Sequence, residues 1–206
     1  MAHGARGRRF GIGAGLAAWL LLAGTMGNVT GQEKEKAKTD DPTAPARARM
    51  VQRHLAERGI KDPRVLDAFR TVPRHRFLPP DLQRQAYEDE SLPIGEGQTI
   101  TPPYDVAFMT EALQPRPTDT VFEVGTGSGY QASILSRLVK DVYSVEIHAP
   151  LGERAAAVIR DLGYTNIHTK IGDAYAGWPD AAPFDAVIVT CAPQSIPQPL
   201  IDQLKE

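Results

Sequence analysis

From residue 120 onward the sequence alternates short apolar runs with glycine-containing turns and helix-like stretches, and this alternation constrains the fold more than any other feature. The stretch after the second run places Leu151, Ala155 and Ile159 at helical spacing. Strands that alternate with helices form parallel sheets with right-handed crossovers. The sequence therefore predicts an α/β fold with a doubly wound, mostly parallel sheet. The predicted strands are residues 120–124, 142–147, 166–171 and 184–190.

The residues before this alternation are expected to form a small helical region. Apolar residues at positions 50, 51 and 55 mark one face of a helix that Gly59 would end. Asp62 is placed to cap a second short helix. A third helix is predicted over residues 104–113, and the polar, glycine-bearing segment 87–103 is predicted to be a loop.

The N-terminal residues differ in composition from the rest of the chain. Arg8 and Arg9 precede an uncharged stretch over residues 10–32, which is typical of a bacterial export signal and weakly of the twin-arginine route. An uncleaved membrane anchor is the alternative, because about 20 apolar residues can span a bilayer. The expected organisation is an export signal or membrane anchor at 1–32, a disordered linker at 33–49 and one domain at 50–206.

The fourth apolar run, residues 184–190, is apolar without interruption through Val187, Ile188 and Val189. Such a run is typical of a strand covered on both faces, and at a sheet edge it would expose unpaired backbone groups. The chain ends soon after it, at Glu206. We therefore expect that the last strands of the domain are missing from this sequence.

Charge and cysteine content argue against two classes of function. The chain holds 23 basic and 25 acidic residues, and no basic stripe is present, so a nucleic-acid partner is not expected. Cys191 is the only cysteine, and the histidines lack ligand spacing, so no metal site is expected. Cys191 itself is predicted to be a small buried apolar side chain at the end of the fourth strand.

Three glycines, Gly125, Gly127 and Gly129, follow the first predicted strand in the stretch "VFEVGTGSGYQAS". The dinucleotide fingerprint places its third glycine three residues after the second, and that position is Tyr130 here. A nicotinamide-dependent dehydrogenase is therefore disfavoured. Glycine-rich turns also occur as plain connections between a strand and a helix, so the motif needs support from other residues.

Two carboxylates at the ends of the next strands supply this support. Glu146 ends the second strand, 21 residues after Gly125, where an acidic side chain can accept hydrogen bonds from a ribose. Asp173 follows the third strand, where it could face an adenine amino group. Each could instead be a solvated loop acid or a helix cap. Together they outline an adenosine pocket.

Glu123, just before the glycines, indicates which adenosine compound would bind. A carboxylate there would repel a pyrophosphate but suits a ligand that carries an ammonium and a sulfonium cation. These features together predict S-adenosyl-L-methionine as the co-substrate.

Five motifs then resemble one family, the protein-L-isoaspartate O-methyltransferases. They are, in order, "VLDAFRTVPRHRF", "PIGEGQTITPP", "VFEVGTGSGYQAS", "GDAYAGWP" and "FDAVIVTCAP", and the resemblance covers about residues 51–206. The resemblance implies the Rossmann-like S-adenosylmethionine-dependent methyltransferase fold. It also implies methyl transfer to the free carboxylate of L-isoaspartyl residues in age-damaged proteins and peptides, whose methyl ester then closes to a succinimide.

The resemblance also implies roles for individual residues. The family's active-site hydroxyl falls on Thr101, where relatives often have serine, and Gln98, Thr99 and Ile100 form the substrate loop. The family is usually monomeric and cytoplasmic. The family's cofactor positions fall on Glu123, Gly125, Gly127, Gly129, Glu146 and Asp173.

Two other functions remain open at this point. A methyltransferase acting on a small molecule would have no reason to carry the "GQTIT" loop. A domain that lacks its last strands could bind S-adenosylmethionine without catalysis.

Overall fold

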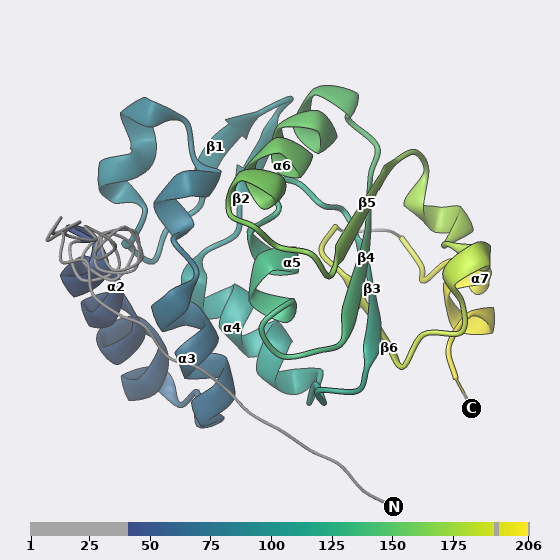
Figure 1. Cartoon of the computed structure of the whole chain (residues 1–206), viewed down its shortest axis with the longest axis horizontal. Helices are drawn as coiled ribbons and strands as arrows, with labels where there is room; N and C mark the ends of the chain where they lie inside the picture. The colour runs from purple at the N-terminus through teal and green to yellow at the C-terminus, as the bar shows by residue number, and fades with distance from the viewer. Residues whose placement is uncertain (1–40, 192–193, 206) are drawn as a thin grey trace, which may run out of the picture. The chain divides into compact units, whose positions relative to one another are not determined.

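The structure, a computed structural model, describes residues 41–191 and 194–205 (Figure 1). The predicted export signal or anchor and residues 33–40 of the predicted linker lie outside these residues. Pro42–Glu206 belong to one compact unit. Within the described part, none of the helices has the length and apolar character needed to cross a membrane.

A four-stranded parallel sheet forms the centre of this unit, which confirms the predicted fold class. The strands lie in the order β5-β4-β3-β6, so the chain moves outward from β3 to β5 and then returns to the other side of β3. Ligands bind at such a switch point, outside the carboxyl ends of the strands. The strands are β3 (Thr120–Val124), β4 (Asp141–Glu146), β5 (Ile167–Ile171) and β6 (Ala186–Val189).

Apolar side chains cover both faces of the sheet, as the alternation along β3 requires. Val121 packs into the core shared with the N-terminal helices, whereas the next residue, Phe122, packs into a second core with Leu200 of α7. Figure 1 shows α4, α5 and α6 on one side of the sheet and α7 on the other. These helices are α4 (Pro103–Ala112), α5 (Tyr130–Leu135), α6 (Ala149–Asp161) and α7 (Gln198–Asp202).

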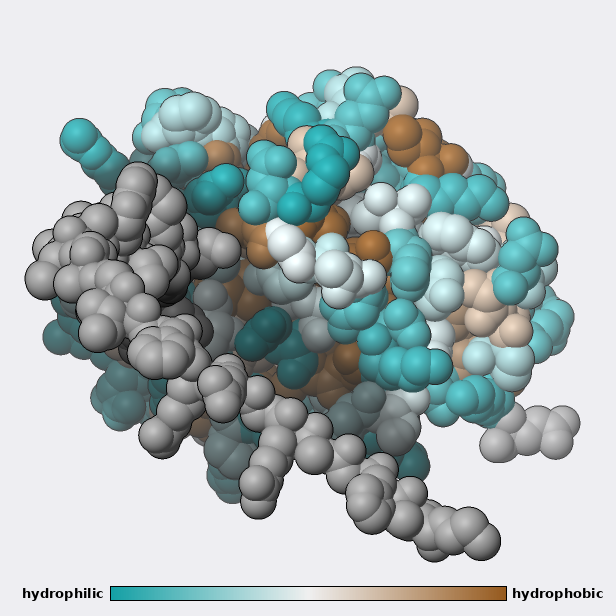
Figure 2. All heavy atoms as spheres, viewed as in Figure 1, coloured by the Kyte–Doolittle hydropathy of each residue, from teal (hydrophilic) through white to brown (hydrophobic). Residues whose placement is uncertain are grey.

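The exposed side of α6 is mostly hydrophilic, as Figure 2 shows. Its charged residues Glu153, Arg154 and Arg160 are exposed, whereas Leu151 and Ala155 are buried. The residues that the helical periodicity placed on one face of α6 are therefore the ones that face the core.

The last strand differs from its prediction. The run 184–190 was predicted to be covered on both faces, but in β6 only Ile188 is buried and Ala186, Val187 and Val189 are partly exposed. Among the described residues β6 is the end strand of the sheet, paired on one side with β3. A strand with one pairing partner is less enclosed than the apolar run indicated.

The helical region begins earlier than predicted, which corrects the end of the predicted linker. Helix α2 spans Ala44–Met50 and continues through a π-helical turn, Val51–Leu55, and a 3-10 turn, Ala56–Arg58. Arg47 is buried, and its guanidinium donates to the backbone oxygen of Arg70 at 2.5 Å. A charged side chain is thus buried and hydrogen-bonded at a helix position where the prediction required an apolar residue. For this reason the sequence did not indicate the helix before residue 50.

The other predicted helices are confirmed. Helix α3 spans Pro63–Thr71, and Oδ1 of Asp62 accepts the backbone N–H of Arg64 at 2.8 Å as its N-terminal cap. Gly59 ends the preceding turn with φ +103°, and α4 lies within one residue of its predicted bounds. The remaining 3-10 turns are Arg74–Phe77, Pro80–Gln85, Ala174–Ala176 and Pro179–Ala181.

The segment 87–103, predicted to be a loop, contains a β-hairpin instead. Strands β1 (Leu92–Gly95) and β2 (Gln98–Ile100) pair antiparallel. The two turn residues, Glu96 and Gly97, both have positive φ, at 51° and 68°, as a type I′ hairpin turn requires. The hairpin holds the chain from Gln98 onward in a fixed place beside the sheet.

Candidate active site

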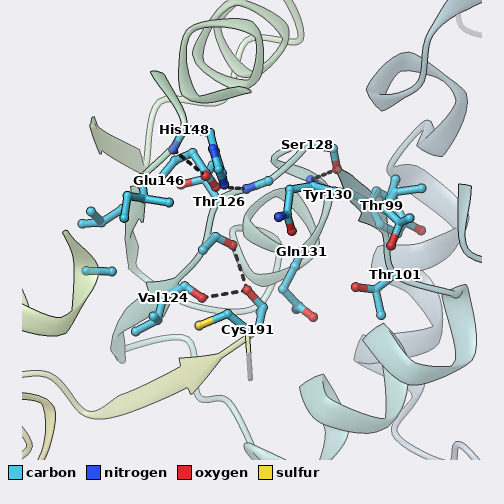
Figure 3. A pocket seen from close by; sticks show the side chains of 18 of the residues that line it. Thr99, Thr101, Val124, Thr126, Ser128, Tyr130, Gln131, Glu146, His148 and Cys191 are labelled. Atoms are coloured by element: carbon cyan, nitrogen blue, oxygen red, sulfur yellow. Dashed lines mark hydrogen bonds between the residues drawn. The ribbon is translucent and has the colours of Figure 1, made fainter. Parts of the chain in front are cut away.

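A cavity of about 400 Å³ lies at the carboxyl ends of β3, β4 and β5 (Figure 3). This is the size range of pockets that enclose small-molecule ligands. Its walls come from the turns after these strands, the start of α5, the end of β6 and the hairpin. All the predicted site residues line it except Glu123 and Gly129.

The glycine turn after β3 forms one wall of the cavity. Gly125 has φ +96°, and a Cβ atom there would lie 2.9 Å from Oγ1 of Thr190. Thr190 Oγ1 lies 2.7 Å from the backbone oxygen of Val124 and 2.8 Å from that of Gly125, so it fastens this turn to the end of β6. Only glycine fits this contact at this φ without strain.

Gly129, which was also predicted at a cofactor position, lies where two helices meet. It is the N-terminal cap of α5, and a Cβ atom there would meet Cδ1 of Ile159 at 3.1 Å. Gly129 therefore allows α5 to pack closely on α6 and does not line the cavity.

Glu146 lies at the end of β4 and lines the cavity although it is buried. Its Oε2 accepts the N–H of Gly127 at 2.7 Å, and its Oε1 accepts the N–H of His148 at 2.9 Å. Each carboxylate oxygen keeps acceptor capacity for a further donor. The two backbone bonds thus fix the carboxylate in the wall of the cavity.

Asp173 both caps a turn and lines the cavity. Its Oδ1 accepts the N–H of Tyr175 at 2.9 Å and so caps the 3-10 turn Ala174–Ala176. The two interpretations that the sequence offered for Asp173 are therefore compatible.

Glu123 lies beneath the cavity rather than in its wall. Its Oε2 accepts a hydrogen bond from Ser144 Oγ at 2.5 Å, and Ser144 Oγ lies 2.6 Å from Oγ1 of Thr126, which does line the cavity. Oε1 of Glu123 is buried with no protein partner. Burial raises the pKa of Glu123 to about 8, the Ser144 hydrogen bond opposes this, and the charge of Glu146 adds to it. Glu123 is therefore connected to the cavity only through Ser144 and Thr126.

The hairpin supplies the opposite wall. Gln98, Thr99, Ile100 and Thr101 all line the cavity, and Thr101 is partly exposed just before α4 begins. Figure 3 shows the Thr101 hydroxyl directed into the cavity, across from Val124 and Cys191. The predicted active-site hydroxyl and the predicted adenosine carboxylates thus share one cavity.

Several residues that line this cavity were not predicted from the sequence. Cys191 was predicted to be buried, but it is exposed and lines the cavity. Its place after the carboxyl end of β6 was the signal for this, because residues there lie at the switch point. The other missed lining residues that carry polar groups are Thr126, Ser128, Tyr130, Gln131, His148, Tyr175 and Thr190.

Among residues 41–191 and 194–205 no cluster of histidine, cysteine or acidic side chains could hold a metal ion. The cavity does fit S-adenosylmethionine: it has a carboxylate fixed at the end of β4, an open glycine turn and buried polar atoms without partners.

The sequence profile of the protein-L-isoaspartate(D-aspartate) O-methyltransferase family matches residues 46–206. The chain belongs to this family. The protein-L-isoaspartate O-methyltransferase of Opitutus terrae is 49% identical over 191 residues, which cover 93% of this chain and 78% of that protein. Its counterpart in Roseiflexus sp. is 57% identical over 150 residues, covering 73% of this chain and 69% of that protein.

Solved structures agree with the family assignment. A protein-L-isoaspartate O-methyltransferase matches with a TM-score of 0.71 and 31% identity, over 78% of this chain and 52% of that chain. A Plasmodium falciparum family member, solved with S-adenosyl-L-homocysteine, shares the fold with a TM-score of 0.68 and 22% identity, over 78% of this chain and 80% of that one. Membership in this family confirms the predicted fold, the methyltransferase class and S-adenosylmethionine as co-substrate.

Proposed function

We propose that this cavity binds S-adenosyl-L-methionine next to the free carboxylate of an L-isoaspartyl residue in a damaged protein or peptide. The chain then methylates that carboxylate and so starts the repair of the residue through a succinimide. The observation that carries this proposal is that Thr101 of the substrate loop and Glu146 of the adenosine pocket line the same cavity.

The chain's own residues divide the cavity into two ends. Glu146 and Asp173 lie where they would accept hydrogen bonds from the ribose hydroxyls and from the adenine amino group, respectively. The turn at Gly125 and Gly127 lies between them and the hairpin. When bound, S-adenosylmethionine supplies a methyl group whose bond to the sulfonium sulfur breaks as the substrate's carboxylate oxygen takes the methyl.

Thr101 would position the substrate rather than activate it. An isoaspartyl carboxylate is already ionised at neutral pH, so it needs no general base. The Thr101 hydroxyl can donate a hydrogen bond to one carboxylate oxygen and so hold the other in line for the transfer. The residues that line the cavity at the hairpin end carry no carboxylate, so an anionic substrate is not repelled there.

Substitutions at Thr101 test this role. We expect Thr101→Ala to lower kcat/KM for an L-isoaspartyl peptide by about 10- to 100-fold, since one positioning hydrogen bond to a charged group is lost. Thr101→Ser keeps the hydroxyl and should keep most of the activity. Both variants should bind S-adenosylhomocysteine normally. Thr118→Ala, an exposed site that does not line the cavity, is the matched control. Full activity of Thr101→Ala would contradict the assignment.

Three further proposals rest on the sequence. From residues 1–32 we infer that the chain is exported to the periplasm or attached to a membrane. From its charge we infer that it has no nucleic-acid partner. From the family we infer that it acts as a monomer. Cell fractionation, light scattering and nucleic-acid binding at low salt test them. A cytoplasmic protein, a stable dimer or salt-sensitive nucleic-acid binding would contradict the respective proposal.

A further inference from the structure

Gln131, in the first turn of α5, lines the cavity with a side chain that has one unused hydrogen-bonding group. The residue is 7% exposed. Its Nε2 donates to Thr110 Oγ1 on α4 at 2.9 Å, but its Oε1 is buried and has no partner. A buried acceptor without a partner is costly and uncommon, so this atom indicates a missing ligand group.

The neighbouring threonine fixes which way the Gln131 amide points. Thr110 is fully buried, and its hydroxyl donates to the backbone oxygen of Val106 at 2.7 Å. Because a hydroxyl has one proton, Thr110 can only accept from Gln131. The amide nitrogen must therefore face Thr110, which leaves Oε1 as the free acceptor.

The charges around the cavity indicate the donor that Oε1 would accept. The lining carboxylates are Glu146, the last residue of β4, and Asp173, in the turn after β5. Gln131 lies beyond β3, on the side of α4 and the hairpin, where the lining residues are neutral. The amino-acid part of S-adenosylmethionine extends away from its ribose, and its ammonium group carries three N–H donors. At this end of the cavity it must find neutral oxygen acceptors.

We propose that Gln131 Oε1 accepts a hydrogen bond from the α-ammonium group of the methionine part of S-adenosylmethionine, with Thr110 as the residue that positions it. This inference rests on the proposed function and adds a binding residue to it.

Binding measurements on the full chain test the proposal without turnover. We expect Gln131→Leu to raise the Kd of S-adenosylhomocysteine about tenfold or more, because a hydrogen bond to a charged group is lost. 5′-Methylthioadenosine lacks the amino-acid part, so its Kd should change less than about twofold in the same variant. This second ligand also shows that the adenosine pocket is intact.

A second variant, Gln131→Glu, tests whether a negative charge at this position favours binding of the ammonium group. In this variant the Thr110 hydroxyl must turn its proton from the Val106 oxygen to the new carboxylate, which has no N–H to donate. A carboxylate beside an ammonium cation should then bind S-adenosylhomocysteine at least as tightly as the wild type does. Thr110→Val removes the anchor of the amide and should weaken S-adenosylhomocysteine alone, by less than Gln131→Leu does. If Gln131→Leu does not fold, the Kd values of Gln131→Glu and Thr110→Val for the two ligands test the proposal.

Three results would overturn the proposal. They are an unchanged Kd for S-adenosylhomocysteine in Gln131→Leu, an equal loss for both ligands, and a loss in Gln131→Glu as large as in Gln131→Leu. A wild-type chain that methylates isoaspartyl peptides while giving any of these results would keep the proposed function and reject only the role of Gln131.

Discussion

Replacing Glu123 by glutamine should remove most of the pH dependence of stability that this buried carboxyl creates. Burial raises the pKa of Glu123 from 4.5 to about 8. The native state therefore holds a proton that the unfolded chain releases above pH 4.5. The free energy of unfolding must fall as the pH rises from 4.5 through about 8, because the unfolded state binds fewer protons in that window.

The magnitude follows from the difference between the two pKa values. At 1.36 kcal/mol per pKa unit, the full titration of Glu123 costs roughly 5 kcal/mol, and the part between pH 5 and pH 7 costs about 2–3 kcal/mol. Glutamine keeps an acceptor for Ser144 Oγ but has no charge to bury. The change in the free energy of unfolding that glutamine itself causes is the same at every pH. The slope of the free energy of unfolding against pH is therefore the quantity that tests the role of Glu123.

Urea unfolding of the full chain at several pH values between 5 and 8 measures this slope. We expect the wild type to lose about 2–3 kcal/mol more than Glu123→Gln between pH 5 and pH 7. Parallel stability curves for the two proteins would refute the reasoning, because they would mean that Glu123 ionises in the native state as easily as in the unfolded chain.

Three other predictions follow from single contacts. Gly125→Ala should destabilise the protein by about 1–3 kcal/mol, because its Cβ would lie 2.9 Å from Thr190 Oγ1 at a φ of +96°; unchanged urea unfolding would contradict this. Asp62→Ala should cost about 1 kcal/mol through loss of the cap on the N–H of Arg64, and Asp62→Asn should restore it. S-Adenosylhomocysteine should slow alkylation of Cys191, which lines the cavity; an unchanged rate by mass spectrometry would place the ligand elsewhere.

The elements that could be predicted from the sequence are those whose pattern is local. The apolar run of β3 predicts a strand, and the periodicity of α6 predicts a helix, each within a short stretch of sequence. Asp62 before Pro63 likewise predicts the start of α3. The hairpin was missed because its turn residues, Glu96 and Gly97, are not the Asn-Gly or Asp-Gly pair that usually marks a type I′ turn.

The sequence indicated candidate residues for the site but not their geometry. That Glu146 and Asp173 lie close together was predictable, because one ends and the other follows a parallel strand, and the carboxyl ends of such strands share one edge of the sheet. Glu123 was predicted to contact the ligand, but it lies beneath the cavity. Its partner on the neighbouring strand β4, Ser144, hydrogen-bonds its carboxylate there. Gln131 depends on Thr110, 21 residues earlier on another helix, and no local pattern shows that contact.

Paired peptides test the central claim most directly. The full chain is given S-adenosylmethionine with one peptide that contains L-isoaspartate and with its twin that contains normal aspartate, and base-labile methyl ester is followed by mass. We predict ester on the isoaspartyl peptide and none on the aspartyl twin. Ester on neither peptide, from a folded chain that binds S-adenosylhomocysteine, would contradict the claim and leave a protein that binds the co-substrate without methylating this substrate.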